Sequence, residues 1–416
     1  MSTMLKRLLE RIFREGALGV RLPDGALIGV NVADARGAAV LVRIHDNATV
    51  RALLLHPALA LGEAYRDGTL TFERGDLADL MALIGRNLRR RPLAMGGPFA
   101  PWIRALFASL HSANGLAQAR RNAQRHYDLP LALYERFLDP DLHYSCAYFR
   151  NPRMSLEAAQ AAKVRHIVAK LLVAPGQRVL DIGCGWGGLA IALGRDHSAE
   201  VLGVTLSPSQ VAEARRRIRA ARLTARVRIE LQDYREVEPS FDRIVSVGMF
   251  EHVGRPNFSA YFKQVARLLR EDGIALIHTI GRTGPPLATN AFVRKYIFPG
   301  GYIPSLSEIL PAIERAGLVL GDCEVLRLHY AETLKAWRER FLAAPPPDGL
   351  DDHFRRLWEY YLASSEVGFR YGELVVFQLQ LAHRLDAMPI TRDYITDADD
   401  AGAEDALVWG GRVFPA

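Results

Sequence analysis

The strongest constraint on the fold is an alternation of short apolar stretches with longer charged ones, which runs from residue 178 to about residue 280. Buried strands are indicated by RVLDI, EVLGVTL, VRIEL, DRIVSVG and GIALIHTI, because each is short, apolar and rich in Val, Ile or Leu. Helices are indicated between them by GLAIALG, SQVAEARRRIRAA and YFKQVARLL. Strands that helices separate in this way pair in parallel, so the alternation predicts an α/β fold with a helix-covered sheet.

Composition limits the class of protein. With 416 residues, of which 49% are apolar, the chain can bury a large core and is expected to form two domains. Its uncharged stretches are shorter than the roughly 18 to 20 apolar residues of a membrane-spanning helix, and the start MSTMLKRLLERIF carries charges where a secretory signal has an uncharged core. Three cysteines without a CxxC pair argue against a disulfide scaffold and a zinc site. We therefore expect an intracellular protein without a metal.

The residues before the alternation read as a small α+β domain. Short strands are expected within residues 18–45 and helices near 48–64 and 76–88, after an amphipathic basic helix at the start. A Pro and Gly cluster at 92–98 marks the end of this domain, and a long helix is expected at about 351–384. The expected domains are 1–90 for lipid binding or docking, 91–125 as a basic linker, 126–390 around the sheet, and 391–416 as an acidic tail.

The net charge of +7 is concentrated in one stretch, because residues 86–125 hold eight Arg and no acid. Apolar residues such as Trp102 and Phe107 lie near Arg104 in this basic strip, a mixture that is typical of a segment at a lipid headgroup boundary. Nucleic acid is the competing partner, but no helix-turn-helix, zinc-finger, RRM or KH pattern accompanies the charge. A solvated linker explains the charge equally well.

A glycine-rich turn follows the first strand of the alternation. In VLDIGCGWGG, the residues Gly183, Gly185 and Gly187 lie between a strand and a helix, where a ligand can approach the backbone and the helix N-terminus. The spacing differs from the dinucleotide pattern GxGxxG, and the next strand ends in VTL instead of an acid, which argues against NAD. The turn reads much like that of S-adenosylmethionine methyltransferases, although their usual ribose-binding acid is absent.

From about residue 126 to 385, the chain resembles the cyclopropane-fatty-acyl-phospholipid synthase family. The matching strings, in family order, are HYDLPLALYERFLD, YSCAYF (144–149), LDIGCGWGGLA, GVTLSPSQ, FDRIVSVGMFEHVG (241–254), HTIG (278–281), KYIFPGGYIPS (295–305) and HYAETL (329–334). The resemblance implies a Rossmann-like class I methyltransferase sheet with a helical lid within residues 126–390. The residues before 90 are similar to the amino-terminal domain of phospholipid-acting members, a weaker match.

The resemblance also implies a donor site for S-adenosyl-L-methionine. Tyr144 and Ser145 are expected to approach the donor, and Gly183, Gly185 and Gly187 to line its amino-acid and ribose portion. The ribose is assigned to Thr205, Leu206 and Gln210, which stand in place of the usual acid. Asp233 and Tyr234 are expected to reach the adenine, although Asp233 is equally suited to capping a turn.

The reaction that the family catalyses makes unusual demands. A methyl group passes to a lipid double bond, and the carbocation that forms must then lose a proton without being captured by water. Aromatic faces stabilise a cation, and the candidates are Tyr144, Tyr148, Phe149 and Phe250, each of which is also a candidate for the core. In relatives the base is a bicarbonate ion, and the positions that match its site here are Cys146 and Ile280 through the backbone, with Glu251, His278 and Tyr330.

Departures from the family leave the product open. Ser365 replaces a cysteine that is frequent in the last long helix, Leu131 replaces a polar residue, and the carboxyl-terminal run differs from the best-known synthases. Alternatives are a methyl-branched or methylene chain, small-amine N-methylation, and a lipid-binding protein with a relic fold. The expected partners are a phospholipid membrane surface and an unsaturated acyl chain, without nucleic acid; a homodimer is compatible with the sequence. The expected location is cytoplasmic, peripheral on the inner face of the bacterial membrane.

Overall fold

The computed structural model describes residues 2–88, 129–238, 240–345, 349–400, 408–409 and 412–413. These residues form two compact units. The first contains residues 2–88 together with Thr289–Pro299 and Leu334–Leu374, and the second contains the remaining described residues. The division therefore does not follow the chain from end to end, because segments from the carboxyl-terminal half belong to the first unit.

The second unit is built on a seven-stranded sheet with the order β10-β11-β9-β8-β5-β6-β7. Its strands are β5 (Arg178–Ile182), β6 (Glu200–Thr205), β7 (Val227–Leu231), β8 (Phe241–Val247), β9 (Leu269–Arg282), β10 (Val319–Leu326) and β11 (Leu374–Ala382). The pairs β5/β6, β5/β8, β6/β7 and β8/β9 are parallel, whereas β10 and β11 are antiparallel. The α/β class expected from the alternation is thus confirmed, and all five anticipated strands are present.

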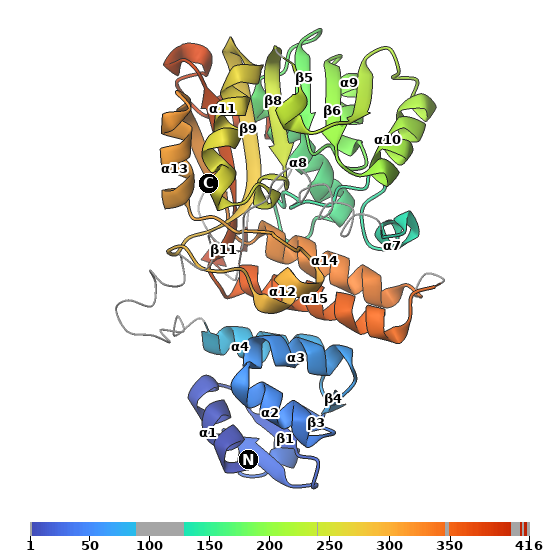
Figure 1. The fold of residues 1–416 in the computed structure, drawn as a ribbon, viewed down its shortest axis with the longest axis vertical. Helices are drawn as coiled ribbons and strands as arrows, with labels where there is room; N and C mark the ends of the chain where they lie inside the picture. The colour runs from blue at the N-terminus through green and yellow to red at the C-terminus, as the bar shows by residue number, and fades with distance from the viewer. Residues whose placement is uncertain are drawn as a thin grey trace. The chain divides into compact units, whose positions relative to one another are not determined.

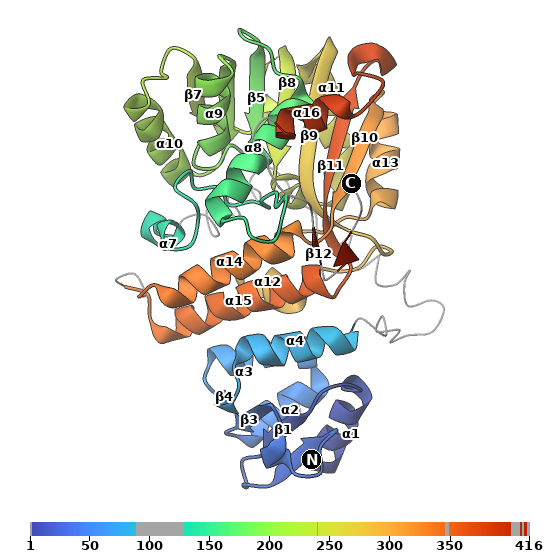
Figure 2. The same cartoon turned by 180° about the vertical axis from the view of Figure 1, so that it is seen from behind.

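Helices cover both faces of this sheet (Figures 1 and 2). They are α8 (Leu156–Leu171), α9 (Gly188–Asp196), α10 (Pro208–Ala220), α11 (Phe258–Leu268), α13 (Leu306–Arg315) and α16 (Asp393–Asp400). The short helix α7 (Leu131–Glu135) lies below α10 in Figure 1 and covers neither face. Because side chains alternate along a strand, Leu180 and Ile244 pack with α11 and α13, while Val179 and Val245 pack with α8, α9 and α10. Two apolar cores result, one on each face.

The first unit has a smaller sheet with the order β2-β1-β3-β4. Its elements within residues 2–88 are α1 (Ser2–Ile12), β1 (Leu18–Arg21), β2 (Leu27–Val30), β3 (Val40–Ile44), α2 (Asn47–Leu55), α3 (Pro57–Arg66), β4 (Leu70–Arg74) and α4 (Leu77–Leu88). The apolar face of α1 is used within the unit, since Leu5 is buried in its core and Leu9 and Ile12 pack against that core. The amphipathic pattern at the start of the chain therefore reflects docking onto the unit's own sheet.

Later segments complete the first unit: α12 (Ala291–Tyr296), the part of α14 (His329–Ala343) from Leu334 onward, and α15 (Asp352–Arg370). Met81 of α4 is buried in one cluster with Phe292 of α12 and Tyr360 of α15. Gly62 of α3 allows a close approach here, because a Cβ at this position would lie only 2.4 Å from the Phe292 ring. The amino-terminal fold therefore shares an apolar core with segments that follow it by more than 200 residues.

The expected long helix at 351–384 is wrong in its second half. The helix α15 ends at Arg370, and Leu374–Ala382 forms the strand β11 instead. The run LVVFQLQLA is rich in Val, Leu and Phe, which favours a strand, and Gly372 interrupts the helical pattern before it. Of the basic strip, residues 89–125 lie outside the described residues. Within the described part of the chain, no helix is long and apolar enough to cross a bilayer. Near the carboxyl end, β12 (Val408–Trp409) and β13 (Arg412–Val413) pair in antiparallel fashion.

Candidate active site

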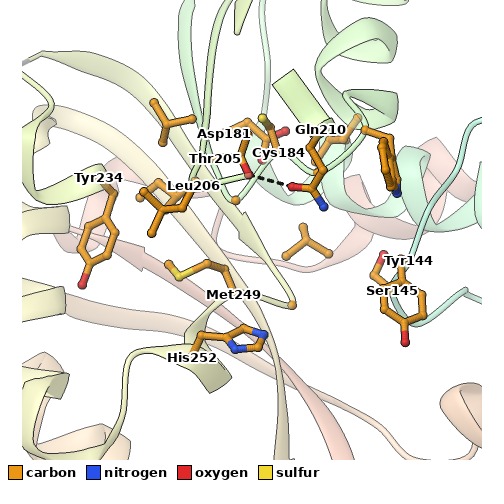
Figure 3. Close-up of a pocket in the computed structure, with 18 of the residues that line it drawn as sticks. Tyr144, Ser145, Asp181, Cys184, Thr205, Leu206, Gln210, Tyr234, Met249 and His252 are labelled. Atoms are coloured by element: carbon orange, nitrogen blue, oxygen red, sulfur yellow. Dashed lines mark hydrogen bonds between the residues drawn. The ribbon is translucent and has the colours of Figure 1, made fainter. Parts of the chain in front are cut away.

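A pocket lies where the parallel strands β5, β6 and β8 end (Figure 3). Its wall is formed by the residues that follow these strands and β7, together with Leu142–Ser145 from the segment before α8. In an open parallel sheet the carboxyl ends of the strands are the usual place for a ligand. The pocket contains nine of the ten residues that sequence reasoning assigned to the donor: Tyr144, Ser145, Gly183, Gly185, Thr205, Leu206, Gln210, Asp233 and Tyr234.

The glycine turn was expected because missing Cβ atoms let a ligand approach the backbone, and the conformation of Gly183 agrees with this expectation. Gly183 has φ of +83°, and a Cβ there would lie 2.8 Å from the Cβ of Met249, so a side chain would be both strained and crowded. The turn is anchored because the amides of Gly183 and Cys184 donate to the carbonyl of Val204 on β6. Gly187 is the exception among the ten residues, since it caps α9 against Ala214 and is not part of the pocket wall.

Two neutral polar side chains occupy the end of β6, where a ribose-binding acid was absent from the sequence. The hydroxyl of Thr205 donates to Gln210 Oε1 at 2.7 Å, as the dashed line in Figure 3 marks. Gln210 is held at the start of α10 because its amide donates to the hydroxyl of Ser207, the residue that caps this helix. The Gln210 side-chain NH₂ then retains its capacity to donate to a bound hydroxyl.

Asp233 caps the short turn η2 (Tyr234–Glu236) by accepting from the amide of Arg235. Both carboxylate oxygens also accept from the Arg235 guanidinium, at 2.8 and 2.7 Å. The capping role that the sequence left open for Asp233 is therefore present, and an adenine amino group would share this carboxylate with Arg235. Beside it, burial raises the pKa of Tyr234 to about 12, so its hydroxyl stays neutral.

Glu251 and Ile280 come together because β8 and β9 are adjacent and parallel. Glu251 lies in the turn η3 (Phe250–His252) after β8, and its Oε1 accepts from the amide of Ile280 at 2.5 Å. Burial raises the pKa of Glu251 to about 7. Its Oε2 is buried and has no hydrogen-bond partner among the described residues. The amide assigned to an anion by resemblance is thus engaged by the Glu251 carboxylate in this structure.

His278 is held by a residue that sequence reasoning missed. The Gln378 side-chain nitrogen lies 3.1 Å from His278 Nδ1, and both residues are buried, on β11 and β9. Burial lowers the pKa of His278 to about 3, so the ring is neutral. An amide nitrogen can only donate, which places the ring proton on Nε2. This Nε2 is buried without a partner among the described residues.

Cys146 and Tyr330 lie on segments that are tied to each other. The amides of Ala147 and Phe149 donate to the Thr333 hydroxyl and to His329 Nδ1, each at 3.0 Å. Tyr330 therefore lies in the first turn of α14, and His329 and Thr333 of the same turn bind the backbone that follows Cys146. Burial raises the pKa of the Cys146 thiol, which keeps it neutral and unsuited to nucleophilic attack.

Two of the aromatic candidates for cation stabilisation are used in packing. The ring of Phe250 is 1% exposed and contacts Phe258, with centroids 4.6 Å apart. Tyr148 is stacked between His166 and His329, at centroid distances of 4.2 and 4.8 Å. The core interpretation is therefore the better one for Phe250. Tyr144, by contrast, lines the pocket.

Sequence reasoning also missed Lys163, which lines the pocket from α8 and is 2% exposed. Its Nζ donates to the Ser145 hydroxyl at 3.0 Å. The signal was present, since Lys163 stands on the buried face of a helix that also carries Ile167 and Leu171. Trp186, Met249 and His252 complete the wall between the anticipated residues.

Comparison with known proteins places the chain in a family. Residues 115–379, more than half of the chain, match the family described as mycolic acid cyclopropane synthetase. The chain belongs to the cyclopropane synthase family. It is 38% identical over 361 residues to the cyclopropane-fatty-acyl-phospholipid synthase of Escherichia coli K12, a match that covers 86% of this chain and 92% of that protein. It is 36% identical over 400 residues to the tuberculostearic acid methyltransferase UfaA1 of Mycobacterium tuberculosis, covering 91% of each.

Solved structures agree with this assignment. The cyclopropane synthase MmaA2 from Mycobacterium tuberculosis aligns with a TM-score of 0.61 at 32% identity, over 63% of this chain and 98% of that one. The mycolic acid cyclopropane synthase CmaA1, solved with SAH and CTAB, aligns with a TM-score of 0.59 at 32% identity, over 63% and 97%. The chain is thus an S-adenosylmethionine-dependent methyltransferase of class I fold, as the sequence indicated.

Proposed function

We propose that this enzyme transfers a methylene group from S-adenosyl-L-methionine to the cis double bond of unsaturated phospholipid acyl chains, which gives cyclopropane fatty acids. The observation that carries the proposal is the pocket at the ends of β5, β6 and β8, which is lined by nine of the ten residues expected for the donor. Two further atoms, the acceptor Glu251 Oε2 and the donor Nε2–H of His278, are buried without a partner among the described residues, and we propose each as a contact of bicarbonate. The 38% identity to a synthase that bears this activity in its name supports the same choice.

The proposed reaction has two steps, methyl transfer and ring closure. The π electrons of the alkene form a bond to the donor methyl, the carbon–sulfur bond breaks, and positive charge remains on the neighbouring carbon. Loss of one methyl proton then closes the ring, so that the lipid gains CH₂ and the donor leaves as S-adenosylhomocysteine with one proton released. Bicarbonate, when bound, supplies the base for that proton.

The chain's own residues orient this step. The Gln378 amide holds the His278 ring so that its Nε2–H can donate to an oxyanion. The Glu251 carboxylate can accept a proton, and its pKa of about 7 suits proton exchange near neutral pH. An anion that took the Ile280 amide would require Glu251 Oε1 to release its hydrogen bond.

A second product is favoured by a specific observation. UfaA1, whose name describes a tuberculostearic acid methyltransferase, matches 91% of this chain. A methylene chain would arise on the same fold if the cation lost a different proton, and a methyl-branched chain if a hydride donor of the host then reduced it. Small-amine N-methylation has weaker support, because the structure of coclaurine N-methyltransferase is only 20% identical and its likeness concerns the fold alone.

The test is the lipid profile of a bacterial host that lacks its own synthase and expresses the full chain. Fatty acids gaining 14 mass units, with cyclopropane proton signals by NMR, are expected. A gain of 16 mass units would identify the methyl-branching alternative, and unchanged lipids beside a methylated amine would overturn the proposal.

We also propose that the enzyme acts at the surface of a phospholipid membrane, on its cytoplasmic face, with the basic strip as its contact.

A further inference from the structure

Lys163 is a buried lysine on the wall of the donor pocket, and the catalytic scheme above does not use it. Among the described residues its Nζ has one hydrogen-bond partner, the hydroxyl of Ser145 at 3.0 Å. An ammonium group has three N–H donors, and burying it with donors unused is costly. A buried titratable group of this kind on a pocket wall is a candidate for ligand binding.

The direction of the bond between Lys163 and Ser145 has a consequence for the pocket. Because an ammonium group cannot accept, the Ser145 oxygen accepts, and the Ser145 hydroxyl proton is directed elsewhere. The backbone of Ser145 is fixed, since its carbonyl accepts from Gln160 Nε2 at 3.0 Å. Ser145 lines the pocket beside Tyr144 (Figure 3), so its proton is available to a ligand there.

A carboxylate of opposite charge stands in the same wall. Asp181, at the end of β5, is 2% exposed, and its Oδ2 has no hydrogen-bond partner among the described residues. The amino-acid end of S-adenosylmethionine carries one carboxylate and one ammonium group. Of the two buried carboxylates in this wall, Asp233 is paired with Arg235 and Asp181 is not. Lys163 and Asp181 therefore match the two charges of this zwitterion, and without Lys163 the Asp181 carboxylate would repel the ligand's own carboxylate.

We propose that Lys163 is a donor-binding residue, which holds the α-carboxylate of the amino-acid portion through its ammonium group and the Ser145 hydroxyl that it orients. This inference rests on the proposed donor pocket and names the group that recognises one end of the ligand. Burial lowers the pKa of Lys163 to about 8, and the charged form that the role needs still predominates at neutral pH.

The test compares two ligands that differ only at the relevant end. S-adenosylhomocysteine carries the amino-acid portion, whereas 5′-methylthioadenosine retains the adenosine and the thioether without it. Binding of both to the full-length wild type and to Lys163→Met is measured by calorimetry. We expect the Kd for S-adenosylhomocysteine to rise roughly 10- to 100-fold, as loss of a charged hydrogen bond implies, and the Kd for methylthioadenosine to change less than about twofold.

The control is Ser155→Ala, which removes the cap of the same helix, α8, away from the pocket. It is expected to lower stability while leaving the ratio of the two Kd values unchanged. Should Lys163→Met fail to fold, Ser145→Ala replaces it, with an expected rise of roughly 3- to 10-fold for S-adenosylhomocysteine alone. Equal weakening of both ligands, or no change in either, would overturn the role of Lys163. Failure of the wild type to bind S-adenosylhomocysteine would instead remove the proposed donor pocket.

Discussion

Burial raises the pKa of the Glu251 side chain more than its hydrogen bonds lower it, and this balance makes its charge sensitive to pH near neutrality. Replacing it by Gln removes the proton acceptor but retains the shape and the bond to the Ile280 amide. We expect product formation by Glu251→Gln to fall by about two or more orders of magnitude. The Kd for S-adenosylhomocysteine should stay within about twofold of wild type, and unchanged turnover would contradict the assignment.

The pH dependence of the reaction rate tests the role of Glu251 a second time. Glu251 is protonated below its pKa of about 7, so the rate should rise as pH increases through that value. The measurement keeps the bicarbonate concentration fixed, since bicarbonate itself titrates nearby. A rate that is flat between pH 6 and 8 would show that the ionised carboxylate is not needed.

Burial of the Asp181 carboxyl in the pocket wall lowers the stability of the folded state at neutral pH. Desolvation raises its pKa from 3.8 to about 7, and attraction to Lys163 offsets this only in part. Folding thus favours the protonated acid below about pH 7, the carboxylate proposed to face the donor predominates above that pH, and stability is lost as pH rises from about 4 through 7. We expect Asp181→Asn to raise the free energy of unfolding by about 2 kcal/mol at pH 8 and to have little effect at pH 4. Denaturant titrations at the two pH values measure this, and a less stable variant at pH 8 would refute it.

At the scale of elements, a buried ion cluster joins α8 to the edge strand β10. Glu324 accepts from His166 at 2.6 Å and from Lys170, whose side chain is fully buried. The Glu324 carboxylate therefore has a pKa well below its usual range. Its contribution to stability is present above the ordinary pKa of a glutamate and is lost as pH falls.

Glu324→Gln should leave Lys170 without its closest anion. We expect the free energy of unfolding at pH 7 to fall by about 2 kcal/mol, because Lys170 loses a charged hydrogen bond and keeps only the more distant Asp322 carboxylate, at 3.6 Å. Arg384→Gln is the matched control, since it breaks the exposed pair with Asp386 and should cost less than about 0.5 kcal/mol. Equal effects of the two substitutions would mean that burial gives the cluster no special weight.

The elements around the donor site were the most predictable from sequence. Strand, glycine turn and helix follow one another locally, and parallel pairing then brings the strand ends together, so Gly183, Thr205 and Asp233 could be placed in one pocket. The strand β11 was missed because its pairing with β10 is decided by distant residues. Lys163 and Gln378 were missed because their roles depend on a tertiary partner, Ser145 or His278, that no local pattern indicates.

At the scale of the whole molecule, the basic strip sets the expected affinity for anionic lipid. Reversal of Arg89, Arg90 and Arg91 to Glu should weaken binding of the full chain to vesicles that contain phosphatidylglycerol, by about 1 kcal/mol per charge. The control reverses Arg216, Arg219 and Arg222, exposed residues in and after α10, for the same change in net charge. Similar losses in both triple variants would reduce the effect to net charge, and no loss would make the strip a linker.

The composition of the first unit has a consequence for synthesis. Ribosomes release residues in order at about 5 to 20 per second, and α15 ends roughly 280 residues after α4. For about 15 to 60 s, therefore, Leu77 and Met81 have emerged while Phe292 and Tyr360, their neighbours in the finished cluster, have not all been translated. The core between Leu5 and Leu83 is complete once the amino terminus has emerged, but this second apolar cluster must wait for helices made much later. Late truncations of the gene would therefore expose apolar side chains in the earliest part of the protein.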